Sequence, residues 1–175
     1  MGTDFLYNCI VNEEVSRSGC TGLGWSLHND ISVPYIVRYG SDYQKKRYLP
    51  RCVSGELITA IAMTEPGAGS DLQGTKTTAV LDGENYILNG SKTFITNGQK
   101  AGLVIVVAKT DTSAGSKGIS LFLVEADFPG FSKGKNLNKL GLKAQDTSEL
   151  FFQDVKVPKE NLLGEEGPGG MNRIQ

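Results

Sequence analysis

The sequence has no long hydrophobic run and no strong net charge. Its longest uninterrupted apolar stretch covers residues 103–108, far short of the roughly 18 residues needed to cross a bilayer. The formal net charge is −1, so electrostatics give no reason to expect binding to nucleic acid or to a membrane surface. The composition, 39% hydrophobic and 21% charged, is ordinary for a globular protein. We expect one domain, or one domain and part of another.

Cysteine and histidine are also scarce. The three cysteines, Cys9, Cys20 and Cys52, are odd in number and include no CxxC pair, which argues against both a disulfide framework and a metal site. We interpret them as reduced, buried structural thiols in a reducing compartment. His28 is the single histidine. Because no Ser or Cys partner is placed beside it by the sequence, we interpret it as a structural helix residue rather than an acid or base.

Residues 1–56 carry helical signals. Apolar residues recur at a spacing of three or four between residues 5 and 15. A glycine-rich break follows at residues 19–24, and a second helical stretch at 25–38 contains Pro34 as a kink or boundary. Ser41 and Gln44 have capping-box spacing, which predicts that a third helix begins there. The Ser54-Gly55 pair predicts its end.

From residue 57 the signals are those of short strands. Expected strands cover residues 57–63, 76–81, 85–88, 92–96, 103–109, 119–124 and 149–157. The turn at Asp82-Gly83-Glu84 predicts a hairpin. Because no helices separate the strands, we expect an α+β chain, a helical segment followed by an antiparallel β sandwich or barrel-like domain. Residues 161–175 are glycine-rich and linker-like, so we expect a fragment of a longer protein.

The most informative segment covers residues 62–74, where the first expected strand ends. Glycine lets a backbone approach a ligand closely, and the hydroxyls of Thr64 and Ser70 can both donate and accept hydrogen bonds. This arrangement suits a large ligand that carries phosphates, although the spacing is neither the Rossmann nor the P-loop pattern. Taken alone, the segment fits equally well a Pro-Gly turn between two strands, capped by Ser70 and Asp71.

Five segments, in order and spacing, resemble the acyl-CoA dehydrogenase family. They lie at residues 62–74, 86–97, 118–125, 139–147 and 150–158, and they look most like long-chain and broad bacterial members. The family has an N-terminal helical domain, a middle β domain and a C-terminal four-helix domain. The resemblance implies that residues 1–56 match the end of the first domain. Residues 57–160 then match the middle, flavin- and acyl-CoA-binding domain, and 161–175 a linker toward a C-terminal domain.

The resemblance implies an FAD site built from two segments. In the first, Thr64 would reach the flavin ring edge, and Ser70 would lie where the pyrophosphate and the substrate meet. In the second, Phe94 stands where the family often has Trp and would pack on the isoalloxazine, with Thr96 near N5. The alternative is an ordinary strand with Phe94 in the core. The expected cofactor contacts are Ile61, Ala62, Met63, Thr64, Glu65, Pro66, Gly67, Ala68, Gly69, Ser70, Phe94, Ile95 and Thr96.

Expected substrate contacts are Ser70, Ser116 and Lys117. The last could meet a CoA phosphate as a point charge or be a solvated loop residue. A basic stretch consists of Lys133, Lys135, Lys139 and Lys143. It forms either a solvated surface, which we favour, or a contact with a partner subunit.

The resemblance implies FAD-dependent α,β-dehydrogenation of acyl-CoA thioesters by the parent protein. It further implies electron-transfer flavoprotein as electron acceptor, a homo-oligomer, and a location in the cytoplasm of a bacterium or the mitochondrial matrix of a eukaryote. In the family a carboxylate of the C-terminal domain is the base, so we expect no catalytic residue here, an inactive isolated chain, and Glu65 as a brace for the glycine loop. The alternative is a non-catalytic β domain that binds flavin or acyl-CoA in protein interaction.

Overall fold

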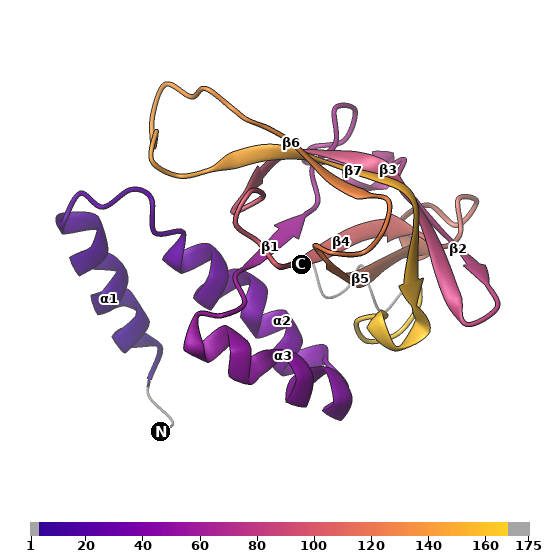
Figure 1. Ribbon diagram of the computed structural model, residues 1–175, viewed down its shortest axis with the longest axis horizontal. Helices are drawn as coiled ribbons and strands as arrows, with labels where there is room; N and C mark the ends of the chain where they lie inside the picture. Colours follow the sequence, from indigo (N-terminus) through magenta and orange to yellow (C-terminus); the bar gives the residue numbers. More distant parts are fainter. Residues whose placement is uncertain (1–3, 168–175) are drawn as a thin grey trace.

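The computed structural model describes residues 4–167, which form a helical part followed by a curled sheet (Figure 1). The helices are α1 (Phe5–Arg17), a π-helix η1 (Leu27–Ser32), α2 (Val33–Tyr39) and α3 (Asp42–Ser54). The strands are β1 (Thr59–Ala62), β2 (Thr78–Asp82), β3 (Asn85–Thr96), β4 (Leu103–Lys109), β5 (Ile119–Glu125), β6 (Phe131–Asn136) and β7 (Thr147–Pro158). Short 3-10 turns are η2 (Leu72–Gly74), η3 (Gly115–Gly118) and η4 (Lys159–Asn161).

The helix boundaries follow the local signals. Ser41 Oγ accepts a hydrogen bond from the Gln44 backbone N–H at 3.2 Å, and the Gln44 side chain accepts from the Ser41 N–H at 3.0 Å. This capping box confirms the predicted start of α3. Gly55 ends the helix in the left-handed conformation, with φ of +78°. Pro34 lies at the start of α2, directly after the π-helix, because proline cannot donate to the turn before it.

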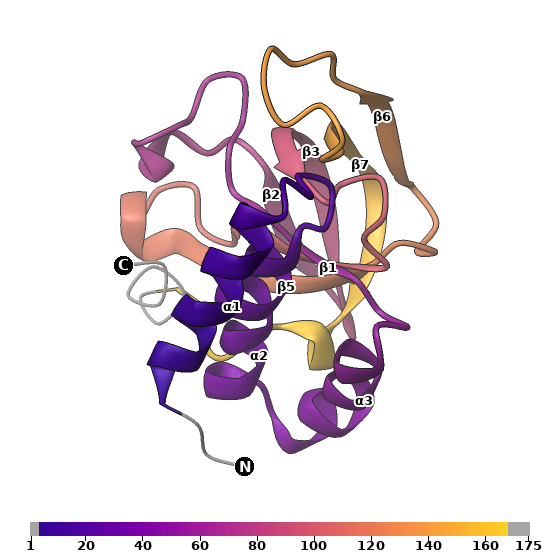
Figure 2. The same ribbon diagram turned by 90° about the vertical axis from the view of Figure 1, so that its left-hand side faces the viewer.

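Helix α1 has the predicted position but not a buried face. None of its residues is buried in the described part of the chain, and Phe5, Leu6 and Ile10 are each more than half exposed. The Asn12 side chain donates to Asp30 Oδ2 at 2.7 Å and so joins α1 to η1. In Figure 2, α1 lies in front of α2.

The seven strands form one sheet in the order β1-β4-β2-β3-β7-β6, with β5 paired to β4. The predicted antiparallel domain is confirmed for most pairs, including the β2–β3 hairpin at Gly83. The pair β1–β4 and a single β2–β4 contact are parallel. Register shifts between β3 and β7 curl the sheet into a half-barrel.

Two strand predictions need correction. Residues 85–88 and 92–96 form one strand, β3, with Gly90 between them. The expected strands stop on either side of Gly90, but the strand needs glycine at this position because an added Cβ would lie 2.4 Å from Thr77 Oγ1. Strand β6 was not predicted, because its sequence, Phe-Ser-Lys-Gly-Lys-Asn, forms an exposed edge with little apolar character.

Both faces of the sheet carry a core. One cluster fills the inside of the curl, around Phe122, Leu88 and Val155. The other packs α2 and α3 onto the opposite face, around Ile36 and Tyr48. Strands covered on both faces read as continuous apolar runs, which explains why β4 was predicted with its observed bounds.

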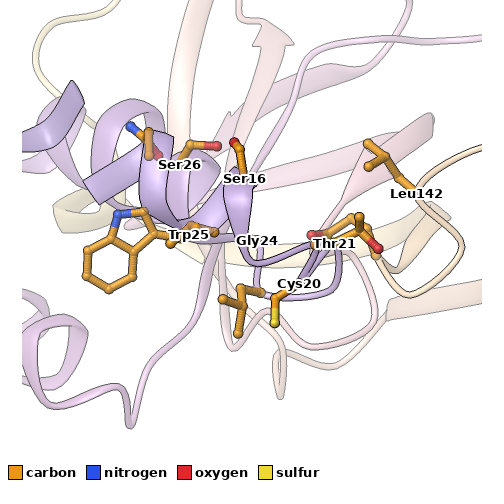
Figure 3. Close-up of a pocket in the computed structure, with 12 residues that line it drawn as sticks. Ser16, Cys20, Thr21, Gly24, Trp25, Ser26 and Leu142 are labelled. Atoms are coloured by element: carbon orange, nitrogen blue, oxygen red, sulfur yellow. The ribbon is translucent and has the colours of Figure 1, made fainter. Parts of the chain in front are cut away.

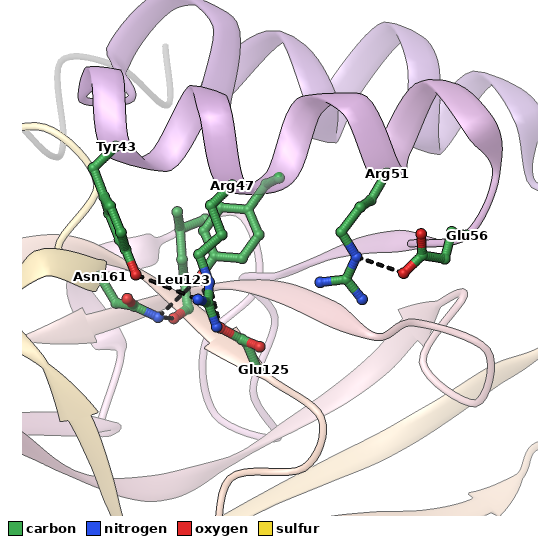
Figure 4. A network of polar contacts seen from close by, with 8 residues as sticks. Tyr43, Arg47, Arg51, Glu56, Leu123, Glu125 and Asn161 are labelled. Atoms are coloured by element: carbon green, nitrogen blue, oxygen red, sulfur yellow. Dashed lines mark hydrogen bonds and ion pairs between the residues drawn. The ribbon is translucent and has the colours of Figure 1, made fainter.

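Polar contacts fasten α3 to the sheet (Figure 4). The Arg47 guanidinium and the Tyr48 hydroxyl both donate to Glu125 Oε1, at 2.8 and 2.9 Å. The Asn161 amide donates to the Leu123 carbonyl at 2.7 Å. Burial, reinforced by Glu125, raises the pKa of Tyr48. The helices, β5 and the segment after β7 are therefore held together as one unit.

The expectation of buried thiols is wrong for two cysteines. Cys9 and Cys20 are exposed, because α1 and the glycine-rich segment bury little in the described residues. Cys52 is buried, and burial raises the pKa of its thiol to about 11. Within residues 4–167, no three His, Cys, Asp or Glu side chains gather as a metal site. No helix in that range is long and apolar enough to cross a bilayer.

Candidate functional site

Strand β1 leads into the glycine loop, residues 63–74. Glu65 and Ala68 exchange backbone hydrogen bonds of 2.8 and 3.1 Å, which closes a tight turn with Pro66 and Gly67 exposed at its tip. A Cβ added at Gly67 or Gly69 would meet no atom within 4 Å. The loop therefore presents bare backbone to open space, which suits the close approach of a large ligand.

The side chains along this segment divide into two groups. Ile61, Ala62, Glu65 and Ala68 are buried, so only their backbone atoms are available to a ligand. Met63 and Thr64 are half-buried, and Ser70 is exposed at the end of the loop. Asp71 caps η2 by accepting from the Gln73 N–H at 3.0 Å. The turn geometry and a ligand-facing surface thus coexist in the same segment.

A buried ion pair braces the loop from below. The Lys92 ammonium is fully buried and donates to Glu65 Oε1 at 2.9 Å and to the Met63 carbonyl at 3.0 Å. Glu65 also accepts from the Lys76 N–H at 2.7 Å and from the N–H and hydroxyl of Thr77 at 3.0 and 2.5 Å. Glu65 therefore braces the loop as expected. Lys92 was missed, because its charge gives no sign of burial in the sequence.

These contacts fix the charge state of Glu65. Burial raises the pKa of Glu65, but hydrogen bonds from Thr77, Lys92 and the Lys76 backbone outweigh it, so its pKa lies below the ordinary value. Burial lowers the pKa of Lys92, and the charge of Glu65 opposes that change. A general base needs a pKa near the working pH. Glu65 is therefore unsuited to take a proton from a substrate.

Strand β3 joins the two expected flavin segments. The Thr93 N–H donates to the Thr64 carbonyl at 2.9 Å, next to the contact of Lys92 with Met63. The next residue, Phe94, has φ of +57° and is 67% exposed. A bulky residue in the left-handed region is a strained outlier of the kind that clusters at functional sites.

The placement of Phe94 tests one of its two interpretations, that of a core residue. An exposed aromatic ring on a strained backbone is not a core residue, so the core alternative is wrong. Ile95 instead is buried in the core, at 2% exposure. The half-buried Thr96 lines a cavity of about 640 Å³. Phe94 and Thr96 are thus available to a ligand near the glycine loop.

The cavity beside Thr96 belongs to a cleft between the helical part and the loop that connects β6 to β7. Residues of the helical wall include Leu27 and Ile31, and Leu142 and Thr147 lie on the opposite wall. A second cavity of about 430 Å³ continues past Cys20 and Trp25 (Figure 3). The cleft was not predicted, because its walls come from segments far apart in the sequence.

A polar network holds the walls of the cleft together. Asn97 is buried in the left-handed conformation, with φ of +62°. Its amide donates to the Thr59 carbonyl at 3.2 Å, and its carbonyl oxygen accepts from Gln145 Nε2 at 2.9 Å. A Cβ added at Gly24 would lie 2.2 Å from Asn97 Oδ1. The glycine-rich segment, β1 and the β6–β7 loop therefore meet at one residue.

His28 joins the helical part to β1. Its Nδ1 accepts from the Thr59 N–H at 3.1 Å, and its Nε2 lies 3.2 Å from the Cys52 carbonyl. Because a backbone N–H can only donate, Nδ1 is the acceptor and Nε2 carries the proton. Both ring nitrogens are engaged, which confirms the structural interpretation.

The expected CoA contacts lie beyond the glycine loop. Ser116 is half-buried and Lys117 is exposed, both in η3. A Cβ added at Gly115 would lie 3.8 Å from Gln73 Oε1. The fold therefore brings η3 next to the turn that follows Ser70.

The solvated interpretation of the basic stretch is wrong for two of its lysines. The Lys133 ammonium donates to the carbonyls of Gln99 and Ala101 at 2.9 and 2.7 Å, and burial lowers its pKa. The Lys139 ammonium donates to the Gln145 carbonyl at 2.5 Å. Lys135 and Lys143 are exposed.

Comparison with known proteins places the chain in a family. Residues 60–155 match the family described as acyl-CoA dehydrogenase, middle domain, and residues 1–56 match its N-terminal domain. The chain belongs to the acyl-CoA dehydrogenase family.

The chain is 58% identical to the long-chain specific acyl-CoA dehydrogenase, mitochondrial, of Sus scrofa, over 97% of this chain and 40% of that protein. It is also similar to the crystal structure of acyl-CoA dehydrogenase from Geobacillus kaustophilus, with 58% identity and a TM-score of 0.95 over 98% of this chain and 46% of that one. A glutaryl-CoA dehydrogenase from Mycobacterium smegmatis, solved in complex with FADH2, is 40% identical, with a TM-score of 0.76 over 85% of this chain and 37% of that one. The chain thus spans about 40% of the length of the curated relatives that it matches.

Proposed function

We propose that the parent protein of this chain is an FAD-dependent dehydrogenase that forms the α,β double bond of acyl-CoA thioesters. The observation that carries the proposal is the pairing of two exposed features by β3. These are the bare glycine loop and the ring of Phe94, which its strained backbone holds away from the core. An exposed, strained aromatic next to open glycine backbone fits an extended aromatic cofactor that carries phosphates.

The residues of this chain would hold the cofactor rather than react with it. Phe94 offers a packing surface for the flavin ring, and Thr64 and Thr96 offer hydroxyls at its edge. Gly67 and Gly69 let the backbone approach. When bound, FAD supplies the acceptor for the β hydride.

The substrate would extend along the surface on both sides of this site. Ser70, Ser116 and Lys117 would meet the CoA part, where a lysine can pair with a phosphate. The cleft beside Thr96 would take the acyl chain, because Leu27, Ile31 and Leu142 give it apolar walls. Such walls also keep water from the reacting carbons.

We propose that no residue of this chain acts as the base, because four donors engage the carboxylate of Glu65 and its pKa lies below the ordinary value. We propose from family membership that the base lies elsewhere in the parent and that electrons pass to electron-transfer flavoprotein. We propose on the same ground that the parent forms a homo-oligomer in the cytoplasm or the mitochondrial matrix. A non-catalytic β domain that binds flavin or acyl-CoA remains the second candidate.

The test is turnover by the full-length parent with acyl-CoA thioesters of increasing chain length and an artificial electron acceptor. We expect bleaching of the flavin absorbance and production of the enoyl thioester, both dependent on the thioester. Flavin binding without bleaching at any chain length would favour the non-catalytic domain instead.

A further inference from the structure

The two cavities of the cleft share part of their lining. Gly24, Ser26, Leu142 and Gln145 line both cavities. Thr96 lines only the larger cavity, and Trp25 lines only the smaller one. Figure 3 shows Leu142 across the smaller cavity from Trp25. A ligand that extends from Thr96 to Trp25 therefore passes these four residues, and among them only Leu142 carries an apolar side chain.

Leu142 is held in a strained conformation at this point. Its φ is +45°, which leucine rarely adopts, and its apolar side chain is 61% exposed. The Gln145 N–H donates to the Leu142 carbonyl at 3.0 Å and closes a turn. Strain of this kind persists only where the surroundings impose it.

The imposing contacts come from both sides of the turn. Gln145 Nε2 donates to Asn97 Oδ1 at 2.9 Å, and the Lys139 ammonium donates to the Gln145 carbonyl at 2.5 Å. Across the cleft, a Cβ added at Gly22 would lie 2.9 Å from the Ala144 carbonyl oxygen. The turn is thus fixed against the residue that follows β3 and against the glycine-rich segment, which sets the position of the Leu142 backbone at the cleft.

We propose that Leu142 is a specificity-determining residue for acyl chain length, because it is the apolar side chain shared by the cavity beside Thr96 and the cavity beside Trp25. The inference rests on the proposed function, since it assigns the cleft to an acyl chain. Short chains stay on the Thr96 side of Leu142, and only chains long enough to pass it contact Trp25. Truncation of Leu142 removes this side chain from both cavities and lets shorter chains reach Trp25.

Trp25 makes the experiment direct, because it is the single tryptophan of the chain. Acyl-CoA thioesters of increasing length are titrated into the 175-residue protein at constant FAD, and Trp25 fluorescence is recorded beside calorimetric binding. Leu142→Ala is compared with Leu140→Ala, which removes the same side chain from the same loop. Leu140 is fully exposed and lines neither cavity, so it controls for any general effect on the loop.

In the wild-type protein and in Leu140→Ala, Trp25 fluorescence responds only above a threshold chain length. In Leu142→Ala that threshold falls, and the affinity ratio of longer to shorter chains changes by about tenfold, as expected when a few methylene groups gain apolar space. If all three proteins bind the thioesters in calorimetry and share the same threshold of Trp25 fluorescence, the role of Leu142 is overturned and the proposed function stays intact. Absence of calorimetric binding at every length overturns the assignment of the cleft to an acyl chain and the role of Leu142, whereas the proposed function is decided by turnover of the parent.

Discussion

Replacement of Lys92 by methionine should destabilise the fold more than the loss of any surface ion pair. The substitution keeps the length of the buried side chain but removes the donor to Glu65 Oε1 and to the Met63 carbonyl. Removing one partner of a buried pair typically costs about 3–5 kcal/mol. Because three other donors still reach the Glu65 carboxylate, we expect a loss of about 3 kcal/mol, at the lower end of that range.

Chemical denaturation of the wild-type protein, the two single variants and the double variant measures this effect. Glu65→Gln leaves the Lys92 ammonium without a counter-charge, and the double variant Glu65→Gln/Lys92→Met restores a neutral pair. The double variant should therefore lose less than the sum of the single losses, by about 1–3 kcal/mol. The control is Glu56→Gln, which breaks the exposed contact of Glu56 with Arg51 and should cost less than about 1 kcal/mol.

The pH dependence gives an independent check. The folded pKa of Glu65 is lowered, so its stabilising contribution is present above the ordinary carboxyl pKa of about 4.3 and is lost as the pH falls through the folded value. The difference between the wild-type protein and Glu65→Gln should be constant near neutral pH and shrink in acid. A Lys92→Met loss no larger than that of Glu56→Gln would show that the buried pair does not brace the loop.

Four further outcomes are expected. Gly24→Ala should lose about 1–3 kcal/mol in denaturation through its clash with Asn97, whereas Gly19→Ala, with no neighbour within 4 Å, should lose less; equal losses would rule out the clash. Phe94→Gly should keep or raise the free energy of unfolding, because it relieves a left-handed φ, while FAD affinity falls; a large loss of stability would mean that Phe94 supports the core. Ser70→Ala in the parent should weaken FAD or acyl-CoA binding by about 0.5–1.5 kcal/mol without unfolding the protein, and unchanged flavin retention and KM would remove Ser70 from the site. The 175-residue chain with added FAD, acyl-CoA and an artificial acceptor should show no turnover above a flavin-only control, and turnover would place a base within it.

The sequence predicts local structure well because the deciding contacts are local. The capping box of Ser41 and Gln44 and the hairpin at Gly83 each depend on residues a few positions apart. Strand β6 was not predicted, because its place is set by pairing with β7 rather than by its own composition. The expected strands stop on either side of Gly90, because the close contact that requires glycine there is with Thr77, in another segment.

The features of the site are likewise predictable only where they depend on local sequence. The glycine loop is visible in the sequence as a set of residue types suited to a phosphate-bearing ligand. The ion pair of Lys92 and Glu65 and the left-handed Phe94 and Leu142 are not visible, because each results from tertiary packing. A lysine within a strand is the one local signal that could have drawn attention to Lys92.

The assignment of Phe94 and the glycine loop to the flavin carries the proposed function. An equilibrium titration of the 175-residue chain with FAD, followed by flavin fluorescence, tests this assignment. The comparison is between the wild-type protein, Phe94→Ala and the control Phe151→Ala, which removes an aromatic side chain that is 40% exposed on β7. We predict weak, saturable binding by the wild-type protein and by Phe151→Ala, and an affinity for Phe94→Ala lower by the roughly 0.5–1.5 kcal/mol of an aromatic contact. Equal affinities for the two phenylalanine variants, or no saturable binding by the wild-type protein, would contradict it.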